Sequence, residues 1–195
     1  MKNVTKKLSG VTLGLMMIGG VHADTFNATA TVSSAITLVE TTPLDLGTLF
    51  LPTTPAANCV LANVSDITIS AVGAAAVIGA ATNNCANADI VSLAPETPGV
   101  ITVTGASPFG SVIVTSGTPT DLIHSSGNPS LPTIIFGSVV TNPLTANSLT
   151  LDANGDGAIT VGGVFRLEDG AAENTTLTAY ADGVYTGTYD ISVSY

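Results

Sequence analysis

The stretch GVYTGTYDISVSY, residues 183–195, decides the fold class because it alternates between two kinds of side chain. From residue 185 onward the even positions are Thr, Thr, Asp, Ser and Ser. The odd positions, Gly187 apart, are large and apolar: Tyr185, Tyr189, Ile191, Val193 and Tyr195. A period of two predicts a half-buried β-strand. Chain ends are usually polar and poorly ordered, so we expect this strand to lie inside a sheet or against a partner.

The same period recurs along most of the chain. In FNATATVSSAITL, residues 26–38, the even positions, Ser34 apart, are apolar: Phe26, Ala28, Ala30, Val32, Ile36 and Leu38. Further expected strands lie at 66–70, 99–105, 110–117, 133–140, 147–152, 158–169 and 174–180. Turns rich in Gly, Pro and Asn separate them, a pattern typical of an antiparallel β-sandwich. The Ala-rich segment 70–82 is interpreted as strand and turn, with a short helix as the alternative.

The N-terminal residues have the pattern of a secretory signal peptide. Three lysines among the first seven residues precede an apolar stretch, residues 8–21, and a small-x-small site at 21–23. That stretch is shorter than the roughly 20 residues that a membrane span needs. We therefore predict a signal peptide over 1–23, an N-terminal strand over 24–39 and one β-sandwich domain over 40–195. The protein is expected to be exported, to the periplasm and then the cell surface, with no membrane span after cleavage.

The charge of the remaining chain excludes several partners. All three lysines lie in the predicted signal, which leaves Arg166 as the one basic side chain against 14 acidic residues, or 1 − 14 = −13. Nucleic acids are bound through Lys and Arg, so we expect no nucleic-acid partner. An anionic membrane surface would repel the chain too.

Cys59 and Cys85 are the two cysteines of the sequence. In an exported protein a disulfide is the natural pairing. Free reactive thiols are the alternative, but neither cysteine has a His or Lys near it in sequence that would lower the thiol pKa. We predict the disulfide Cys59–Cys85.

Enzyme chemistry finds little support in the sequence. His124 is the one His outside the predicted signal and lies in a segment rich in Ser, Gly and Pro. No G-x-S-x-G elbow accompanies it, and no spacing singles out a pair of carboxylates for glycoside hydrolysis. We interpret His124 as an exposed loop residue and expect no catalytic site.

The segment LDANGDGAITVGG, residues 151–163, admits two interpretations. Asp152, Asn154 and Asp156 follow the first half of a D-x-[DN]-x-[DN]-G calcium loop, but Gly163 stands where the closing Glu is expected. The dipeptide Asn154-Gly155 is also a strong signal for a tight hairpin turn. A hairpin turn, with or without bound calcium, is therefore predicted, and calcium is the one cofactor that the sequence suggests.

The two terminal strands pose a further alternative. Exposed strand edges are hazards that proteins avoid, so each strand must find a partner. Either they pair within one closed sandwich, or the N-terminal strand completes the sheet of a neighbouring subunit. Patterning alone does not choose between these.

The segments LDANGDGAITVGGVFRLEDG and ADGVYTGTYDISVSY resemble the C-terminal half of a bacterial family of secreted domains of unknown function, whose members end in a G-x-Y-x-G-x-Y strand. TTPLDLGTL, residues 41–49, resembles an early segment of the same family. The order of features along the chain is also similar to that of archaic chaperone–usher pilin subunits. Both have an alternating N-terminal strand, one disulfide in the first half and a terminal strand with aromatic residues.

The pilin resemblance implies an incomplete immunoglobulin-like fold that a neighbour's strand completes. By position, the donor residues would be Phe26, Ala28, Ala30 and Val32, and the strand lining the groove and held by a periplasmic chaperone would carry Tyr189, Ile191, Val193 and Tyr195. It further implies an outer-membrane usher, self-polymerisation and a role as a structural subunit of a fimbria or pilus. The alternative expectation is a closed, secreted β-sandwich that binds a ligand or cell surface, with calcium at Asp152, Asn154 and Asp156.

Overall fold

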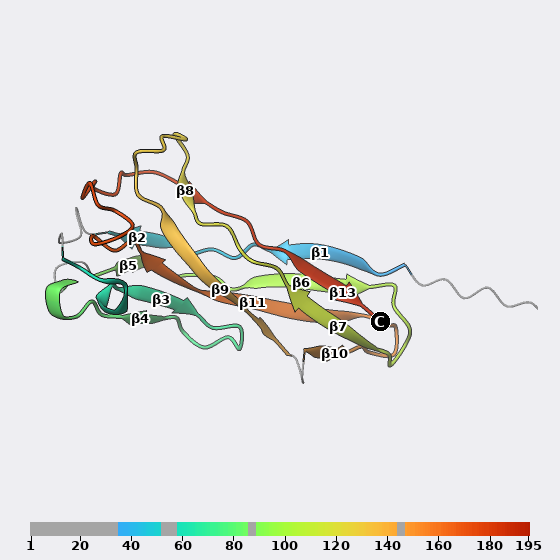
Figure 1. Cartoon of the computed structure of the whole chain (residues 1–195). Helices are drawn as coiled ribbons and strands as arrows, with labels where there is room; N and C mark the ends of the chain where they lie inside the picture. Colours follow the sequence, from blue (N-terminus) through green and yellow to red (C-terminus); the bar gives the residue numbers. More distant parts are fainter. Residues whose placement is uncertain (1–34, 52–57, 86–88, 144–146) are drawn as a thin grey trace, which may run out of the picture. The chain divides into compact units, whose positions relative to one another are not determined.

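The computed structural model describes residues 35–51, 58–85, 89–143 and 147–195, and the chain is all-β there (Figure 1). Every strand pairing is antiparallel, which confirms the predicted fold class and is consistent with a β-sandwich. The predicted signal peptide and Phe26, Ala28, Ala30 and Val32 lie outside the described residues.

The larger sheet is built around the longest strand, β11 (Gly157–Leu167). β9 (Ile134–Asn142) pairs along one edge of β11. The other edge is shared, because β6 (Gly99–Thr104) pairs with the first half of β11 and β3 (Asp66–Ile69) with the second. β1 (Thr37–Thr42) extends the sheet beyond β6, and β4 (Val77–Gly79) extends it beyond β3.

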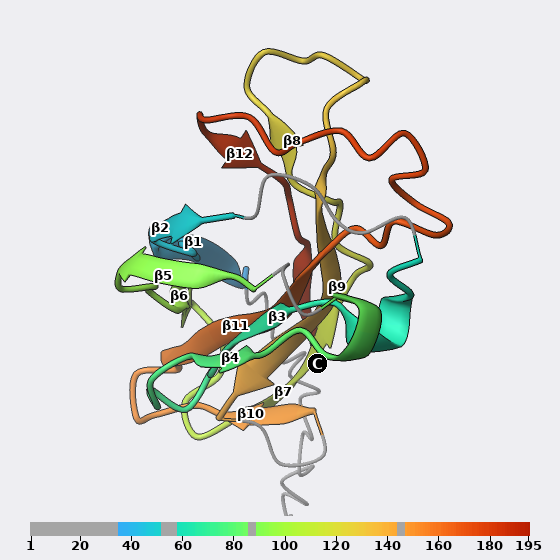
Figure 2. The same ribbon diagram turned by 90° about the vertical axis from the view of Figure 1, so that its left-hand side faces the viewer.

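The smaller sheet has the order β10-β7-β13, with β10 at Ser148–Thr150, β7 at Ser111–Ser116 and β13 at Ile191–Ser194. Two short ribbons complete the set. One pairs β8 (Ile123–His124) with β12 (Tyr185–Thr186), seen together at the top of Figure 2, and the other pairs β2 (Thr48–Phe50) with β5 (Val91–Ala94). Two single 3₁₀ turns, η1 (Leu61–Asn63) and η2 (Asn83–Cys85), are the described helical elements.

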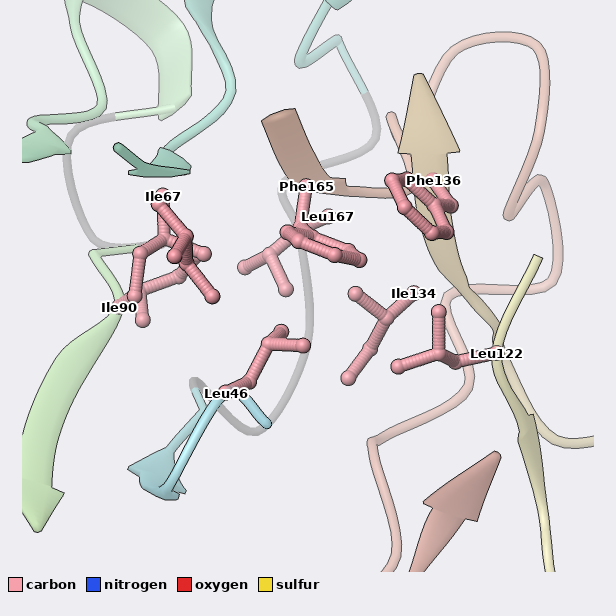
Figure 3. Close-up of a cluster of buried hydrophobic side chains, with 9 residues drawn as sticks. Leu46, Ile67, Ile90, Leu122, Ile134, Phe136, Phe165 and Leu167 are labelled. Atoms are coloured by element: carbon pink, nitrogen blue, oxygen red, sulfur yellow. The ribbon is translucent and has the colours of Figure 1, made fainter. Parts of the chain in front are cut away.

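Two apolar clusters hold these elements together. One lies between the two sheets and joins β6 and β11 to β7 and β10: Ile101, Val103, Ile159, Val161, Val112, Val114 and Leu149. The other gathers around Phe136 and Phe165, whose ring centroids lie 4.2 Å apart. In Figure 3, Leu46 points toward these rings from the segment before β2, and Leu122 and Ile134 approach from the β8–β9 side. In β6 and β7 alternate residues face the cluster between the sheets, as a period of two requires.

The prediction of a strand at 174–180 is wrong, because these residues form a loop. The buried side chain of Asn174 accepts a hydrogen bond from the N–H of Thr178 (2.9 Å) and donates one to its C=O (2.8 Å). Leu177 adopts a positive φ of 52° between them. A side chain that binds its own backbone in this way replaces strand pairing with a closed turn.

The predicted terminal strand is interrupted. It is divided into β12 and β13, and residues 187–190 between them belong to neither. There the chain turns toward Thr120, whose N–H donates to the C=O of Thr188 (2.8 Å). The alternation survives the break, since Tyr185, Tyr189, Ile191 and Val193 are all half-buried.

Three other predictions have definite outcomes. Segment 70–82 contains a turn and β4, as the strand-and-turn interpretation predicted. The Asn154-Gly155 turn is present, but it does not join a paired hairpin, because β10 and β11 belong to different sheets. β1 crosses the predicted boundary at residue 39, so Leu38 packs in the sandwich core, as does Ile36 just before the strand.

No helix among the described residues is both long and apolar enough to span a membrane.

Candidate functional site

The first and last strands of the described chain each leave one edge without a partner strand. β1 pairs with β6 alone, and β13 pairs with β7 alone. The unpaired N–H and C=O groups of such an edge form a template for another strand. The two strands lie in different sheets, and a hydrogen bond from Tyr189, just before β13, to Glu40 of β1 shows that they lie near one another.

Between β1 and the start of β13 lies a cavity of about 380 Å³. Leu38 and Glu40 of β1 line one wall, and Tyr189 and Ile191 line the other. Ile101 of β6, itself part of the inter-sheet core, also lines it. This cavity therefore reaches the apolar interior.

A larger cavity of about 720 Å³ adjoins the first. Its walls are the segments 44–51 and 180–187, and its floor is the second apolar cluster: Leu122, Ile134, Phe136 and Phe165. Both cavities are lined by Leu44, Gly187 and Tyr189. We refer to the two together as the groove.

Tyr189 stands where the two parts of the groove meet. Its hydroxyl donates a 2.7 Å hydrogen bond to Oε1 of Glu40 on the opposite wall. Its ring packs edge-on against Phe136, with centroids 6.4 Å apart. Burial, and then the hydrogen bond to Glu40, raise the pKa of Tyr189 above its ordinary value, so the hydroxyl keeps its proton and remains a donor.

Of the four residues predicted for the groove-lining strand, three face the groove or the core and one is exposed. Tyr189 and Ile191 line the groove, and Ile191 and Val193 pack against the inter-sheet core. Tyr195 is 57% exposed, and its hydroxyl accepts a hydrogen bond from the N–H of Ser107 (2.9 Å).

Sequence reasoning did not identify the opposite wall. Leu38 was assigned to a separate N-terminal strand, and Glu40 and Leu44 were assigned no role. The alternation through Ile36 and Leu38 was the available signal, because it places both side chains on an inward face.

The predicted disulfide is confirmed. Cys59 and Cys85 are bonded, with Cα atoms 4.9 Å apart, and both are buried. With Ala81 they form a third small apolar cluster beside η1 and η2. The bond closes the chain segment that carries β3 and β4.

The Asp152 loop uses its first carboxylate to shape the turn. Oδ1 of Asp152 accepts hydrogen bonds from the N–H groups of Asn154 (2.8 Å) and Asp156 (2.9 Å). These bonds, Asp156 first, hold the pKa of Asp152 below its ordinary value. Within the described ranges no group of three or more His, Cys, Asp or Glu side chains is placed to hold a metal. Calcium at Asp152, Asn154 and Asp156 stays a prediction.

His124 is not the exposed loop residue that was predicted. It lies in β8, half-buried, and packs edge-on against Tyr185 of β12 with ring centroids 5.1 Å apart. Its Nδ1 lies 2.8 Å from Oγ of Ser126 and its Nε2 lies 3.1 Å from the C=O of Asp182. The imidazole thus links the turn after β8 to the turn before β12.

Searches against known family models, curated proteins and solved structures found no match to this chain.

Proposed function

We propose that this protein is a structural subunit of a bacterial surface fimbria or pilus, and that it assembles by donor-strand exchange. One observation carries the proposal: in the described part of the chain β1 and β13 each have one unpaired edge, and β1 and the start of β13 flank the smaller part of a groove that reaches the apolar core. A strand entering there would find backbone partners along its edges and apolar side chains beneath it. The proposal assigns the chain no catalytic chemistry.

The strand order supports this proposal. Immunoglobulin-type sandwiches place strands A, B, E and D in one sheet and C, F and G in the other. The proposal assigns β1, β6, β11 and β9 to A, B, E and D, and β7 and β13 to C and F, with β3 and β4 as additions to the larger sheet. Among the described residues no strand pairs with the edge of β13 that faces away from β7, which is the edge where G would lie. A neighbour's strand would complete the sheet at that edge.

The proposed donor is residues 24–34 of a second copy, the segment before β1 that carries Phe26, Ala28, Ala30 and Val32. Burying Phe26 and Val32 would contribute roughly 3–6 kcal/mol, at about 1.5–3 kcal/mol each. Ile36 and Leu38 add nothing, because they already pack in their own subunit. Backbone hydrogen bonds along β1 and β13 would have to supply the rest.

The proposed route follows from the same groove. A subunit exported by the predicted signal peptide would reach the periplasm with no strand in its groove. A periplasmic chaperone would shield Tyr189, Ile191, Val193 and Tyr195, and an outer-membrane usher would direct the exchange. Residues 24–195 carry a formal charge of −13, with Arg166 as the one basic side chain. The surface therefore offers few positive groups for binding anionic partners.

The test uses residues 24–195 with Phe26→Asp and Val32→Asp, a chain that keeps the groove but has lost the apolar stripe of its donor. A labelled peptide of wild-type residues 24–34 is added, and binding is followed by fluorescence anisotropy. We expect saturable binding and a rise of several degrees in the melting temperature. A peptide with the same two Asp substitutions is the matched control and should not bind.

Size-exclusion chromatography gives the second readout. Wild-type residues 24–195 should assemble into polymers whose size grows with concentration. The Asp-substituted protein should stay monomeric. A wild-type chain that stays monomeric at high concentration, together with no peptide binding, would refute the proposal.

A second candidate function is a closed, secreted β-sandwich that binds a ligand or cell surface. The 720 Å³ cavity favours it, because small-molecule sites are mostly apolar and enclose about 300–1,000 Å³. Calcium dependence would be tested by melting the protein with calcium and with chelator, next to an Asp156→Ala variant. A calcium-induced rise that this variant abolishes would support the calcium form of this function, and equal melting would remove it.

A further inference from the structure

We propose that Tyr189 and Glu40 form a latch across the groove, which must open before an extended chain can occupy its whole length. This inference rests on the proposed function and adds a control to the same site. It concerns the rate at which a strand enters rather than whether the groove exists.

The latch joins the two walls of the groove. Glu40 belongs to β1, and Tyr189 lies 149 positions later, just before β13. Their 2.7 Å hydrogen bond therefore crosses the gap between the two unpaired strand edges. A strand placed between those edges would occupy the space that this bond crosses.

Tyr189 also lies where the two parts of the groove meet, since it lines both the 720 Å³ cavity and the 380 Å³ cavity, as do Leu44 and Gly187. An extended segment such as residues 24–34 is about 35 Å long at 3.2–3.4 Å per residue and would have to pass Tyr189.

The surroundings hold the latch closed. Gly99 of β6 leaves room for the hydroxyl in this position, because a Cβ at residue 99 would lie 3.0 Å from it. The edge-on contact with Phe136 supports the ring from the core side. The bond itself is to a carboxylate, and hydrogen bonds to charged groups are stronger than those between neutral groups. The closed arrangement is thus favoured until an entering strand replaces it.

The test measures the association rate of the labelled 24–34 peptide with residues 24–195 carrying Phe26→Asp and Val32→Asp, the same protein as in the test of the proposed function. Tyr189→Phe and Glu40→Ala are each introduced into this chain. Either change removes the bond, and losing one charged hydrogen bond should raise the association rate about tenfold. Glu96→Ala is the matched control, because the Glu96 carboxylate accepts one hydrogen bond, from the N–H of Ala76 (2.9 Å), and lines neither cavity. It should leave the rate unchanged.

The double variant Tyr189→Phe/Glu40→Ala separates a latch from general loosening of the fold. If both residues act through one bond, the double variant is no faster than either single variant. Rates that multiply, or a Glu96→Ala variant that is equally fast, would overturn the latch. A peptide that binds every variant at the same rate would overturn the latch alone and leave the proposed function standing. A peptide that binds none of them would overturn both.

Discussion

Arg166 and Glu173 form an ion pair through two parallel hydrogen bonds, Nη1 to Oε2 and Nη2 to Oε1, each 2.6 Å long. Arg166 lies in β11, and Glu173 lies in the loop that follows this strand. Both side chains are partly sheltered, with 20% and 29% of their surface exposed. Oε2 of Glu173 also accepts from the N–H of Asp169 (3.0 Å). The pair therefore fastens this loop to the central strand.

Breaking this pair should destabilise the protein measurably. We expect Glu173→Gln to lower the free energy of unfolding by about 1–2 kcal/mol, more than an exposed pair and within the range for a charged hydrogen bond. Arg166→Lys should lose a similar amount, because an ammonium group cannot make the two parallel bonds. Urea unfolding measures both, with Asp182→Asn at an exposed carboxylate as the control. A Lys variant as stable as wild type would show that the paired geometry is unimportant.

The pH dependence of stability should follow three carboxyl groups whose pKa lies below the ordinary value. Arg166 lowers the pKa of Glu173 through their hydrogen bonds. At Asp169 burial opposes ionisation, but the N–H groups of residues 171–173 outweigh it and lower its pKa. Asp152 is the third, for the reason given above. Each group binds its proton less readily in the folded chain than in the unfolded chain.

The sign of the effect follows from linkage. A depressed pKa in the folded state adds stability above the ordinary pKa of about 4, and that stability is lost as the pH falls through the lower folded pKa. The free energy of unfolding should therefore fall below pH 4. In Asp169→Asn the fall should be shallower than in wild type. The check is chemical denaturation of both proteins between pH 7 and pH 2, and parallel curves would contradict the assignment to Asp169.

The disulfide should contribute a large share of the stability. Cys59 and Cys85 are 26 positions apart, and chain-entropy arithmetic gives about 3–3.5 kcal/mol for closing such a loop. We expect Cys59→Ala/Cys85→Ala to lose about this amount in urea unfolding. Reductant should destabilise the wild type and leave the double variant unchanged, which separates the bond from other effects of the reagent. Unfolding curves that superimpose with and without reductant would refute the expectation.

Local pattern was enough to predict most strands and the direction of their side chains. Alternation placed Ile36, Leu38, Ile191 and Val193 toward the interior, and all four pack against the core. The disulfide followed from there being two cysteines. These features depend on period and composition, which a single sequence displays.

The features that were missed depend on contacts between distant positions or on one side chain. The pattern at 174–180 resembles a strand, but the amide of Asn174 captures the backbone of Thr178 and closes a loop. The separation of β10 and β11 into different sheets is decided by packing rather than by the turn between them. The bond between Glu40 and Tyr189 has no local signal. Tyr189 ends the G-x-Y-x-G-x-Y motif, but that motif does not indicate a partner 149 positions away.

Two glycines with positive φ allow backbone strain to be separated from crowding. Gly155 has a φ of 81°, and a Cβ there would lie 2.0 Å from the C=O oxygen of Ala106. Gly127 has a φ of 65°, and a Cβ there would meet no atom within 4 Å. The two sites share a left-handed backbone and differ in the space around it.

Alanine at each site should therefore cost different amounts. Gly127→Ala should lower the free energy of unfolding by about 1–2 kcal/mol, the cost of a left-handed conformation for a residue with a Cβ. Gly155→Ala adds overpacking, typically about 1–3 kcal/mol more, because the loop between β10 and β11 must move away from Ala106. Thermal and urea unfolding of the two variants measure the difference. Equal losses would mean that the 151–156 loop shifts freely, and that the turn between the two sheets is held less tightly than the contact with Ala106 indicates.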